Sequence, residues 1–404
     1  MKEQQAYFDF GYNKLGPLLW GYSHWLLDNF KRNNLHKVYF FSRDGQIMRK
    51  AFHIIRGTKG IEDYYLEVSR RSLRVPILWK NPSLDNLITM LSPSGMISIK
   101  SIFDGVGLDV TAYKTKLMKY GFSEDTVFDR EAILKSPKLL EMYKDIQPDI
   151  ITKSKEEFSL LQKYIKQNNL HGKFAIVDIG WSGGMQRFLQ ETLNTLDISN
   201  EIWGFYTGVA NYYKRNTNNT KLNLNGYLFD FSKNANDTDV RSCFVGLYEL
   251  LFLETAGSVQ NYKVDDTGRI IARRLPYEYS YNGAKMKEAQ FIEIVQNAAL
   301  QYIQDKESLG IKPGDKFCLF KPLLQAGSYP TKDTMNLFAD FRFYDEGVFN
   351  YLAKPHGLFY YLLHPSNFKK DLYMSRWKTA FLRKVFKLPI SYNGLYNILK
   401  SMSK

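Results

Sequence analysis

The chain has 404 residues, of which 44% are hydrophobic, and this composition excludes a wholly disordered protein. At roughly 100–200 residues per domain, the length predicts two domains or one large domain with an insertion. The 55 Lys and Arg outnumber the 41 Asp and Glu, and the formal net charge of +14 favours phosphates, nucleic acid or a lipid surface as partners.

The sequence shows no export signal and no membrane span. Met1 is followed by no apolar run of signal-peptide type, and no window approaches about 18 uninterrupted apolar residues. Cys243 and Cys318 are too few for a disulfide framework or for a structural zinc site. We therefore expect a cytoplasmic protein, with a peripheral position at the inner face of the cytoplasmic membrane left open.

Apolar strands and amphipathic helices alternate along the chain, and this alternation predicts an α/β fold with a mainly parallel sheet. The strands are expected at 37–41, 64–68, 173–178, 202–207 and 226–231, and the helices at 15–30, 46–55, 185–193 and 246–253. Residues 80–165 are expected to be mostly helical, with loops at 92–95 and 147–149.

These elements divide the chain into four parts. Residues 1–80 and 166–262 are expected to form the α/β core, 81–165 a helical insertion, 263–365 a C-terminal extension and 366–404 a basic amphipathic tail. From Lys369 to Lys404 the tail holds nine Lys or Arg and one Asp, a net charge of +8. One helical face of the tail would carry Trp377, Phe381, Leu382, Val385 and Phe386. Such a helix fits an anionic membrane surface, and it also fits docking on the core.

A glycine-rich loop follows the strand at 173–178 and opens the next helix. It comprises Asp178, Ile179, Gly180, Trp181, Ser182, Gly183, Gly184 and Met185. Ligands bind at the carboxyl ends of parallel strands, and the free N–H groups of a helix N-terminus attract anions. We interpret this loop as a phosphate cradle, with a plain strand-to-helix turn as the alternative. It is not a Walker A loop, because no Gly-Lys-Ser/Thr ends it, and its spacing fits a dinucleotide fingerprint poorly.

Two further polar segments follow strands. The first comprises Ser42, Arg43, Asp44 and Gly45, and the second begins with Ser69, Arg70 and Arg71. Arg43 suits bidentate pairing with phosphate oxygens, and Asp44 suits magnesium binding or a role as base. A salt bridge between these two, or a solvated face for the second segment, is the alternative. Three such segments after three strands predict a site for a ligand with more than one phosphate.

Together these segments resemble a known family. The resemblance rests on Leu15-Gly16-Pro17, Phe40-Phe41-Ser42-Arg43-Asp44-Gly45, Ser69-Arg70-Arg71 and Val177-Asp178-Ile179-Gly180-Trp181-Ser182-Gly183-Gly184-Met185-Gln186. They resemble the C-terminal module of proteins labelled predicted haloacid-dehalogenase-type hydrolases in bacterial polysaccharide gene clusters. That module is similar to the glycan phosphoribosyltransferases, which build ribofuranose into O-antigens and capsules. The resemblance covers roughly residues 10–350, with its motifs within 15–210.

The resemblance implies a phosphoribosyltransferase-like sheet, phosphoribosyl pyrophosphate as donor and magnesium as cofactor. It implies transfer of ribofuranose 5-phosphate to a lipid-linked glycan, release of pyrophosphate, and removal of the 5-phosphate by a separate phosphatase. Asp178 matches an acidic position of phosphoribosyltransferases, and residues 182–185 match the loop that holds the 5-phosphate in those enzymes. Ile179 stands where they have a second acidic residue, so the chain departs from the family pattern there. Residues 42–45 correspond to the pyrophosphate loop, and 69–71 would close the site.

The expected mechanism is substitution at the anomeric carbon through an oxocarbenium-like state. Magnesium, with Asp44 and Asp178 as candidate ligands, and Arg43 would stabilise the departing pyrophosphate. Asp178 would also hold the ribose hydroxyls. Asp44 or Glu249 would accept the proton of the acceptor hydroxyl. Glu249 lies in an apolar helical stretch, where an acid is either functional or salt-bridged.

Other functions are left open by the sequence. A phosphatase of the haloacid dehalogenase type needs Asp-x-Asp after a strand, but Ser42 stands at the nucleophile position, so we predict no phosphatase activity. A non-enzymatic scaffold of a polysaccharide assembly complex would account for the basic tail. A nucleotide-sugar glycosyltransferase would have only Asp237-Thr238-Asp239 as its metal triplet. No nucleic-acid partner is expected, because the charge is concentrated at the C-terminus and no recognition module appears.

Overall fold

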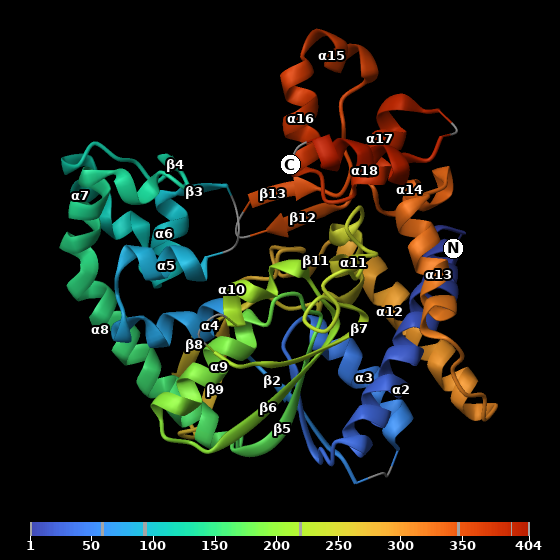
Figure 1. Ribbon diagram of the computed structural model, residues 1–404, viewed down its shortest axis with the longest axis horizontal. Coiled ribbons are helices and arrows are strands. Elements are labelled where there is room, and N and C mark those ends of the chain that lie inside the picture. The colour runs from blue at the N-terminus through green and yellow to red at the C-terminus, as the bar shows by residue number, and fades with distance from the viewer. Residues whose placement is uncertain are drawn as a thin grey trace.

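The computed structural model describes residues 2–57, 60–91, 95–217, 220–345, 348–388 and 390–402. Residues 92–94, most of one predicted loop, lie outside the described residues. At the centre of the molecule is a five-stranded parallel sheet (Figure 1). Its strand order is β2 (Glu62–Leu66), β1 (Lys37–Phe41), β5 (Gly172–Asp178), β6 (Asn200–Val209) and β7 (Asn223–Asp230). The predicted α/β class is confirmed, and β1 has the predicted bounds.

Both faces of the sheet are buried, which explains why β1 is apolar along its length. Val38 and Phe40 belong to the core on one face, and Tyr39 and Phe41 to the core on the other. The first face is covered by α2 (Gly16–Arg32), α3 (Asp44–Arg56) and α12 (Lys287–Ser308), and the second by α9 (Gly184–Thr195) and the end of α8 (Pro137–Gln167). Parallel sheets covered on both faces have such unbroken apolar strands.

The strand order reverses between β1 and β5. From β1 the chain passes through α3 to β2, whereas from β5 it passes through α9 to β6 on the other side. In open parallel sheets, ligands bind outside the carboxyl ends of the strands at such a reversal. The residues that follow β1 and β5 are therefore the first candidates for a functional site.

The insertion has an apolar core of its own. It contains an antiparallel pair, β3 (Met96–Ser98) and β4 (Val127–Asp129), and the helices α5 (Leu84–Met90), α6 (Ile99–Val106) and α7 (Lys114–Lys119). The loop predicted at 147–149 is wrong, because α8 runs unbroken through Pro148. Ile146 and Ile150 on either side of the proline are fully buried in this core, so packing holds the helix across it.

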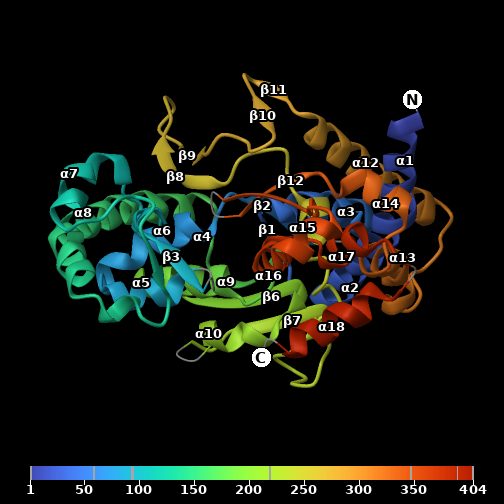
Figure 2. The same cartoon turned by 90° about the horizontal axis from the view of Figure 1, so that it is seen from above.

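The C-terminal third shares one continuous apolar core with the sheet, and this core extends from Tyr7 to Tyr392. The part predicted as an extension packs on α1 (Lys2–Phe10) and α2 through α12 and α13 (Lys316–Ser328), and the part predicted as a tail packs on α13 through α17 (Lys378–Phe386). The remaining strands form pairs, of which β8–β9 and β10–β11 lie along one side of the molecule (Figure 2). Their bounds are β8 (Val259–Val264), β9 (Ile270–Arg274), β10 (Ser280–Tyr281), β11 (Ala284–Lys285), β12 (Arg342–Asp345) and β13 (Val348–Tyr351). The remaining helices include α4 (Arg70–Arg74), α10 (Lys214–Thr217), α11 (Val245–Phe252), α14 (Lys332–Phe338), α15 (Leu358–Leu363), α16 (Pro365–Met374) and α18 (Tyr392–Met402).

The apolar face of α17 lies against the core. Trp377, Phe381, Leu382 and Val385 are each at most 3% exposed. The indole N–H of Trp377 donates to the carbonyl of Gly327 at 2.7 Å. Of the two interpretations of this helix, docking on the core is the one observed, because its apolar face has almost no contact with solvent.

The burial of Trp377 leads to a prediction about stability. Trp377→Ala should lower the free energy of unfolding by about 3–5 kcal/mol, because it removes a large core side chain and leaves a cavity. Urea unfolding followed by circular dichroism measures this change. Phe359→Ala, at an 82% exposed position in α15, is the control and should stay within about 0.5 kcal/mol of the unmutated chain. An unchanged midpoint for Trp377→Ala would show that α17 is not part of the core.

Candidate active site

The carboxyl groups of Asp44 and Asp178 meet at the strand reversal. Asp44 is the first residue of α3, three residues after the end of β1, and Asp178 is the last residue of β5. The negative charge of Asp178 contributes to the raised pKa of Asp44, so the two groups interact electrostatically. The structure thus brings together the two acidic residues that the sequence placed after separate strands.

Both carboxyl groups hold their protons to higher pH than a free aspartic acid. Burial raises the pKa of Asp178 to about 7, while the N–H groups of Ile179 and Gly180 and the charge of Arg70 oppose the rise. Burial also raises the pKa of Asp44 well above its usual range, and the charge of Asp178 adds to this rise. The pair is therefore short of positive charge, and a bound cation would relieve that deficit.

Magnesium could use only part of its ligand set from this chain. Among the described residues, no group of three or more His, Cys, Asp or Glu is placed to hold a metal ion. Mg²⁺ commonly takes one or two carboxylates and completes its shell with water and substrate phosphates. The carboxyl pair of Asp178, which is buried, and Asp44, which is half-buried, fits that arrangement, because its charge is only partly compensated.

Glu249 joins the same site from α11. Residues 246–248 and 250–252 of α11 are buried, and Glu249 between them is half-buried. Its carboxylate accepts a hydrogen bond from Nε1 of Trp181 at 2.8 Å. Its charge also raises the pKa of both Asp44 and Asp178. Glu249 thus acts electrostatically on both aspartates, and its role as base stays a prediction.

The glycine-rich loop is held in place on both sides. The carbonyl of Trp181 accepts from the N–H of Ala210 at 2.7 Å, and the hydroxyl of Ser182 accepts from Nδ2 of Asn216 at 3.0 Å. Gly183 caps α9 with φ of 74°, and a Cβ there would lie 2.8 Å from Leu224. This glycine is required by the backbone, since other residues rarely adopt such a φ.

The loop places the first turn of α9 at the carboxyl edge of the sheet. The N–H groups of Gly184, Met185 and Gln186 are the first of this helix, and a helix gives its first N–H groups no internal partner. A Cβ at Gly184 would lie 3.6 Å from Asn216, an ordinary contact, so the fold does not require glycine at this position. The side chain of Met185 packs on the second core, and only its backbone is suited to bind a ligand.

The basic residues are not arranged as predicted. Nη1 of Arg43 pairs with Glu278 at 2.7 Å and donates to Ser258 at 2.5 Å, while the charge of Arg43 still lowers the pKa of Asp44. The positive φ of 72° at Arg43 sends the side chain toward the loop between β9 and β10. Neither the predicted pyrophosphate contact nor a salt bridge to Asp44 describes its observed partners.

Arg70 also acts on the carboxyl pair. Its charge lowers the pKa of both aspartates and so lies within reach of the carboxyl pair. Arg71 leaves the site, because its guanidinium pairs with both carboxylate oxygens of Glu157 at 3.1 Å. Only one member of this predicted basic pair therefore acts on the site.

Ser42, Gly45 and Ser69 hold the backbone. The hydroxyl of Ser42 donates to the carbonyl of Val68 at 2.5 Å, and Ser42 is 6% exposed. The hydroxyl of Ser69 caps α4 and donates to the carbonyl of Val259. A Cβ at Gly45 would lie 3.1 Å from the carbonyl carbon of Phe40. These three residues therefore have structural contacts, and their predicted ligand contacts stay predictions.

Several residues at the site were missed by sequence reasoning. The guanidinium of Arg241 lies 3.3 Å from the ring centre of Trp181 and pairs with Asp239 at 3.3 Å. Glu254 accepts from the hydroxyl of Tyr65 at 2.5 Å and pairs with Arg274 at 2.8 Å, which ties β9 to β2. The contacts of Arg241 with Trp181 and of Glu254 with Tyr65 join residues far apart in the sequence, so no local sequence pattern predicts them.

The aspartates considered as a glycosyltransferase metal triplet have other partners. Asp237 accepts from the N–H of Asp230 at 2.6 Å, and Asp239 pairs with Arg241. Both carboxylates hold the loop after β7 in place. This arrangement does not favour a nucleotide-sugar site at these residues.

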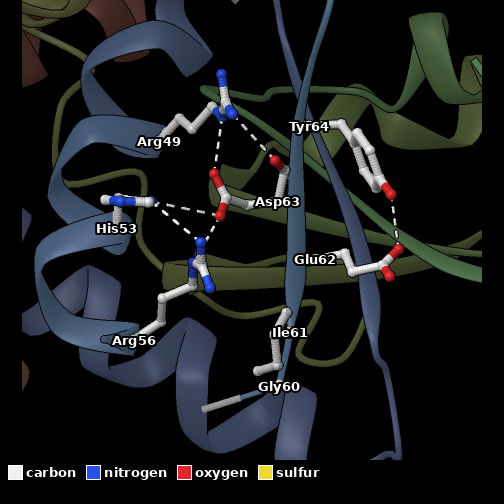
Figure 3. A pocket seen from close by; sticks show the side chains of 8 residues that line it. All are labelled: Arg49, His53, Arg56, Gly60, Ile61, Glu62, Asp63 and Tyr64. Atoms are coloured by element: carbon white, nitrogen blue, oxygen red, sulfur yellow. Dashed lines mark hydrogen bonds and ion pairs between the residues drawn. The ribbon is translucent and has the colours of Figure 1, made fainter. Parts of the chain in front are cut away.

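A second ionic cluster lies at the opposite end of the sheet (Figure 3). Parallel register places Asp63 beside Val38, near the start of both strands. The carboxylate of Asp63, 2% exposed, pairs with Arg49 at 2.8 Å and with Arg56 at 2.5 Å, and His53 lies at 3.5 Å. These side chains line an open hollow of about 560 Å³. Because Asp63 engages both arginines, we assign the cluster a structural role that fastens α3 to β2.

No protein-family model matches the chain, and the comparison with curated proteins finds no match either. Across the described ranges, no helix combines the length and apolar character needed to cross a membrane. The function of the site is therefore argued from its geometry and charge.

The raised pKa of Asp178 leads to a prediction about pH. An acid whose pKa is higher in the folded state costs stability as pH rises from about 4, the unfolded value, through about 7. Asp178→Asn should therefore raise the free energy of unfolding at pH 8 by on the order of 1–3 kcal/mol, and the gain should vanish near pH 4.

Thermal unfolding at several pH values measures this effect. The matched control is Asp197→Asn, the same chemical change at an exposed position beyond the other end of α9, which should give no pH-dependent gain. A loss of stability for Asp178→Asn at pH 8 would contradict the burial of an uncompensated charge.

Proposed function

We propose that this chain is a magnesium-assisted glycan phosphoribosyltransferase. It would transfer ribofuranose 5-phosphate from phosphoribosyl pyrophosphate to a glycan hydroxyl in bacterial polysaccharide biosynthesis. One observation supports this most: the pair Asp44 and Asp178 lies at the strand reversal, beside a glycine-rich loop that opens α9. Such an edge suits a ligand with phosphates at both ends and hydroxyls between them.

In this proposal the loop and α9 hold the 5-phosphate. The N–H groups of residues 182–186 and the positive end of the helix dipole face an anion without needing a basic side chain. Asp178, at the root of the loop, would accept hydrogen bonds from the ribose hydroxyls. The fixed backbone at Gly183 would set the distance between the two contacts.

The pyrophosphate would lie toward α3 and α4. Asp44 and Asp178 would hold magnesium, which when bound supplies positive charge to the pyrophosphate as it departs. Arg70 and Arg43 would contribute the protein's own positive charge there, because the effect of Arg70 reaches both aspartates and that of Arg43 reaches Asp44. When the negative charge that develops on the leaving group is stabilised, the barrier for substitution at the anomeric carbon is lower.

Glu249 is the better candidate for the base. It is half-buried, and only its Oε1 is engaged by Trp181. Asp44 holds its proton to higher pH and so is less available to accept one. Glu249 would take the proton of the acceptor hydroxyl while Trp181 fixes the orientation of the carboxylate.

The hydrolase alternative has less support. Ser42 stands where a haloacid dehalogenase has its nucleophile, and its hydroxyl is buried against the carbonyl of Val68. A purely structural scaffold leaves the carboxyl pair unexplained, because uncompensated charges cost stability. Phosphatase activity would therefore come from a separate protein.

Donor binding tests the proposal directly. Calorimetric titration should show phosphoribosyl pyrophosphate binding only when magnesium is present, with much weaker binding of ribose 5-phosphate and of a nucleotide-sugar. Asp178→Asn should weaken binding by roughly 10–100-fold, because it removes hydrogen bonds from a charged acceptor. Asp197→Asn should bind as the unmutated chain does. If all three ligands bind equally, or if no ligand binds, the result would contradict the proposal and favour the scaffold function.

Gly184→Val tests the phosphate cradle separately. The modest steric demand at this position predicts a folded protein, checked by circular dichroism. The added side chain should block close approach to the first N–H groups of α9 and weaken donor binding by roughly tenfold or more. If the folded variant binds the donor with unchanged affinity, the assignment of the 5-phosphate to this loop is wrong.

A further inference from the structure

Helices α15 and α16 carry a concentrated apolar surface. Phe359 is 82% exposed, Leu362 66% and Leu363 78%, all within the six residues of α15. Tyr373, near the end of α16, is 70% exposed. Single exposed apolar residues are common on proteins, but a cluster of this density marks a surface that contacts something else.

The apolar surface does not result from a poorly packed hairpin. On the inner side, Tyr361 is 5% exposed, contacts the rings of Phe368 and Phe381, and donates its hydroxyl to Asp371 at 2.9 Å. This inner contact fixes the two helices on α17. The outer side chains of α15 are therefore held outward by a well-packed inner face.

The surroundings of this surface are basic. From Lys354 to Lys387 the chain holds eight Lys or Arg and one Asp, a net charge of +7. Lys354, Lys369 and Lys370 are exposed. The one acid, Asp371, is engaged by Tyr361 on the inner side. An exposed apolar tip flanked by lysines complements a surface that is apolar below and negatively charged above.

We infer that the α15–α16 hairpin seats in the surface of an anionic lipid membrane. Phe359, Leu362 and Leu363 would enter the boundary between headgroups and acyl chains, while Lys369 and Lys370 meet the anionic headgroups. Figure 1 shows α15 at the top of the molecule with α16 below it, α17 to the right of the hairpin and α18 lower down. The membrane contact thus moves from the buried face of α17 to α15.

The inference stands without the proposed enzymatic function, but the two are compatible. The N–H of Gly246, next to the start of α11, donates to the carbonyl of Arg376 just after α16. The helix that carries Glu249 is thereby joined to the segment that carries the hairpin. A membrane-seated hairpin would bring the candidate site to the side on which a lipid-linked acceptor lies.

Vesicle sedimentation of the full chain tests the inference. The protein should bind vesicles of phosphatidylcholine mixed with phosphatidylglycerol, and bind vesicles of phosphatidylcholine alone much more weakly. The triple variant F359S/L362S/L363S should weaken binding by roughly 100-fold, because it removes three apolar anchors from solvent-exposed positions. Lys369→Gln with Lys370→Gln should weaken binding by roughly tenfold at low salt.

A matched control triple variant is M118S/Y281S/L309S, at positions 75%, 72% and 69% exposed elsewhere on the molecule. It should bind vesicles as the unmutated chain does. Failure of the unmutated chain to bind anionic vesicles, or equal binding by both triple variants, overturns the inference. A dimer in solution that only F359S/L362S/L363S dissociates, without vesicle binding, assigns the surface to a second copy instead. Donor titration of the same variants separates this result from failure of the proposed function.

Discussion

The close approach of Asp44 and Asp178 is the constraint on which the rest of the site depends. Strand reversal places the ends of β1 and β5 next to each other, so an acid after each strand must share one buried space. Burial and mutual repulsion both raise the free energy of the charged pair. A fold bears such a cost where the groups act on a ligand, and it must then stabilise the surrounding elements by other contacts.

Those contacts are found at both ends of the sheet. At the carboxyl edge, Glu254 joins Tyr65 of β2 to Arg274 of β9. At the amino end, Asp63 binds Arg49 and Arg56 of α3. The second cluster holds the far half of the helix whose first residue is Asp44. These ion pairs, distant from Asp44, help to fix its position, while the charges of Arg43 and Arg70 offset only part of the rise in its pKa.

The sequence was sufficient for the features that depend on local pattern. Apolar runs located β1 and β5, and the polar residues that end them located Asp44, Asp178 and the glycine loop. Side-chain direction could not be predicted, because Arg43 turns toward Glu278, which lies 235 residues away. The loop predicted at Pro148 was wrong for a similar reason, because contacts within the insertion core keep α8 helical through the proline. Helix α12 was not predicted, because α1, α2 and α3 pack against it on several sides and its sequence therefore lacks a clear amphipathic pattern.

The distribution of charge brings these observations together. A donor with several phosphates and a pair of carboxyl groups carry the same sign, so they can share a site only if cations or protons stand between them. Arg70 provides one positive charge, and the raised pKa of Asp178, about 7, shows that protons supply part of the remainder near neutral pH. A metal ion at the pair would displace those protons, because carboxylates bind metals in their charged form. Proton release on metal binding would then couple the charge of the site to the arrival of its ligand. Near neutral pH the pair would therefore carry more negative charge with a cation bound than without one.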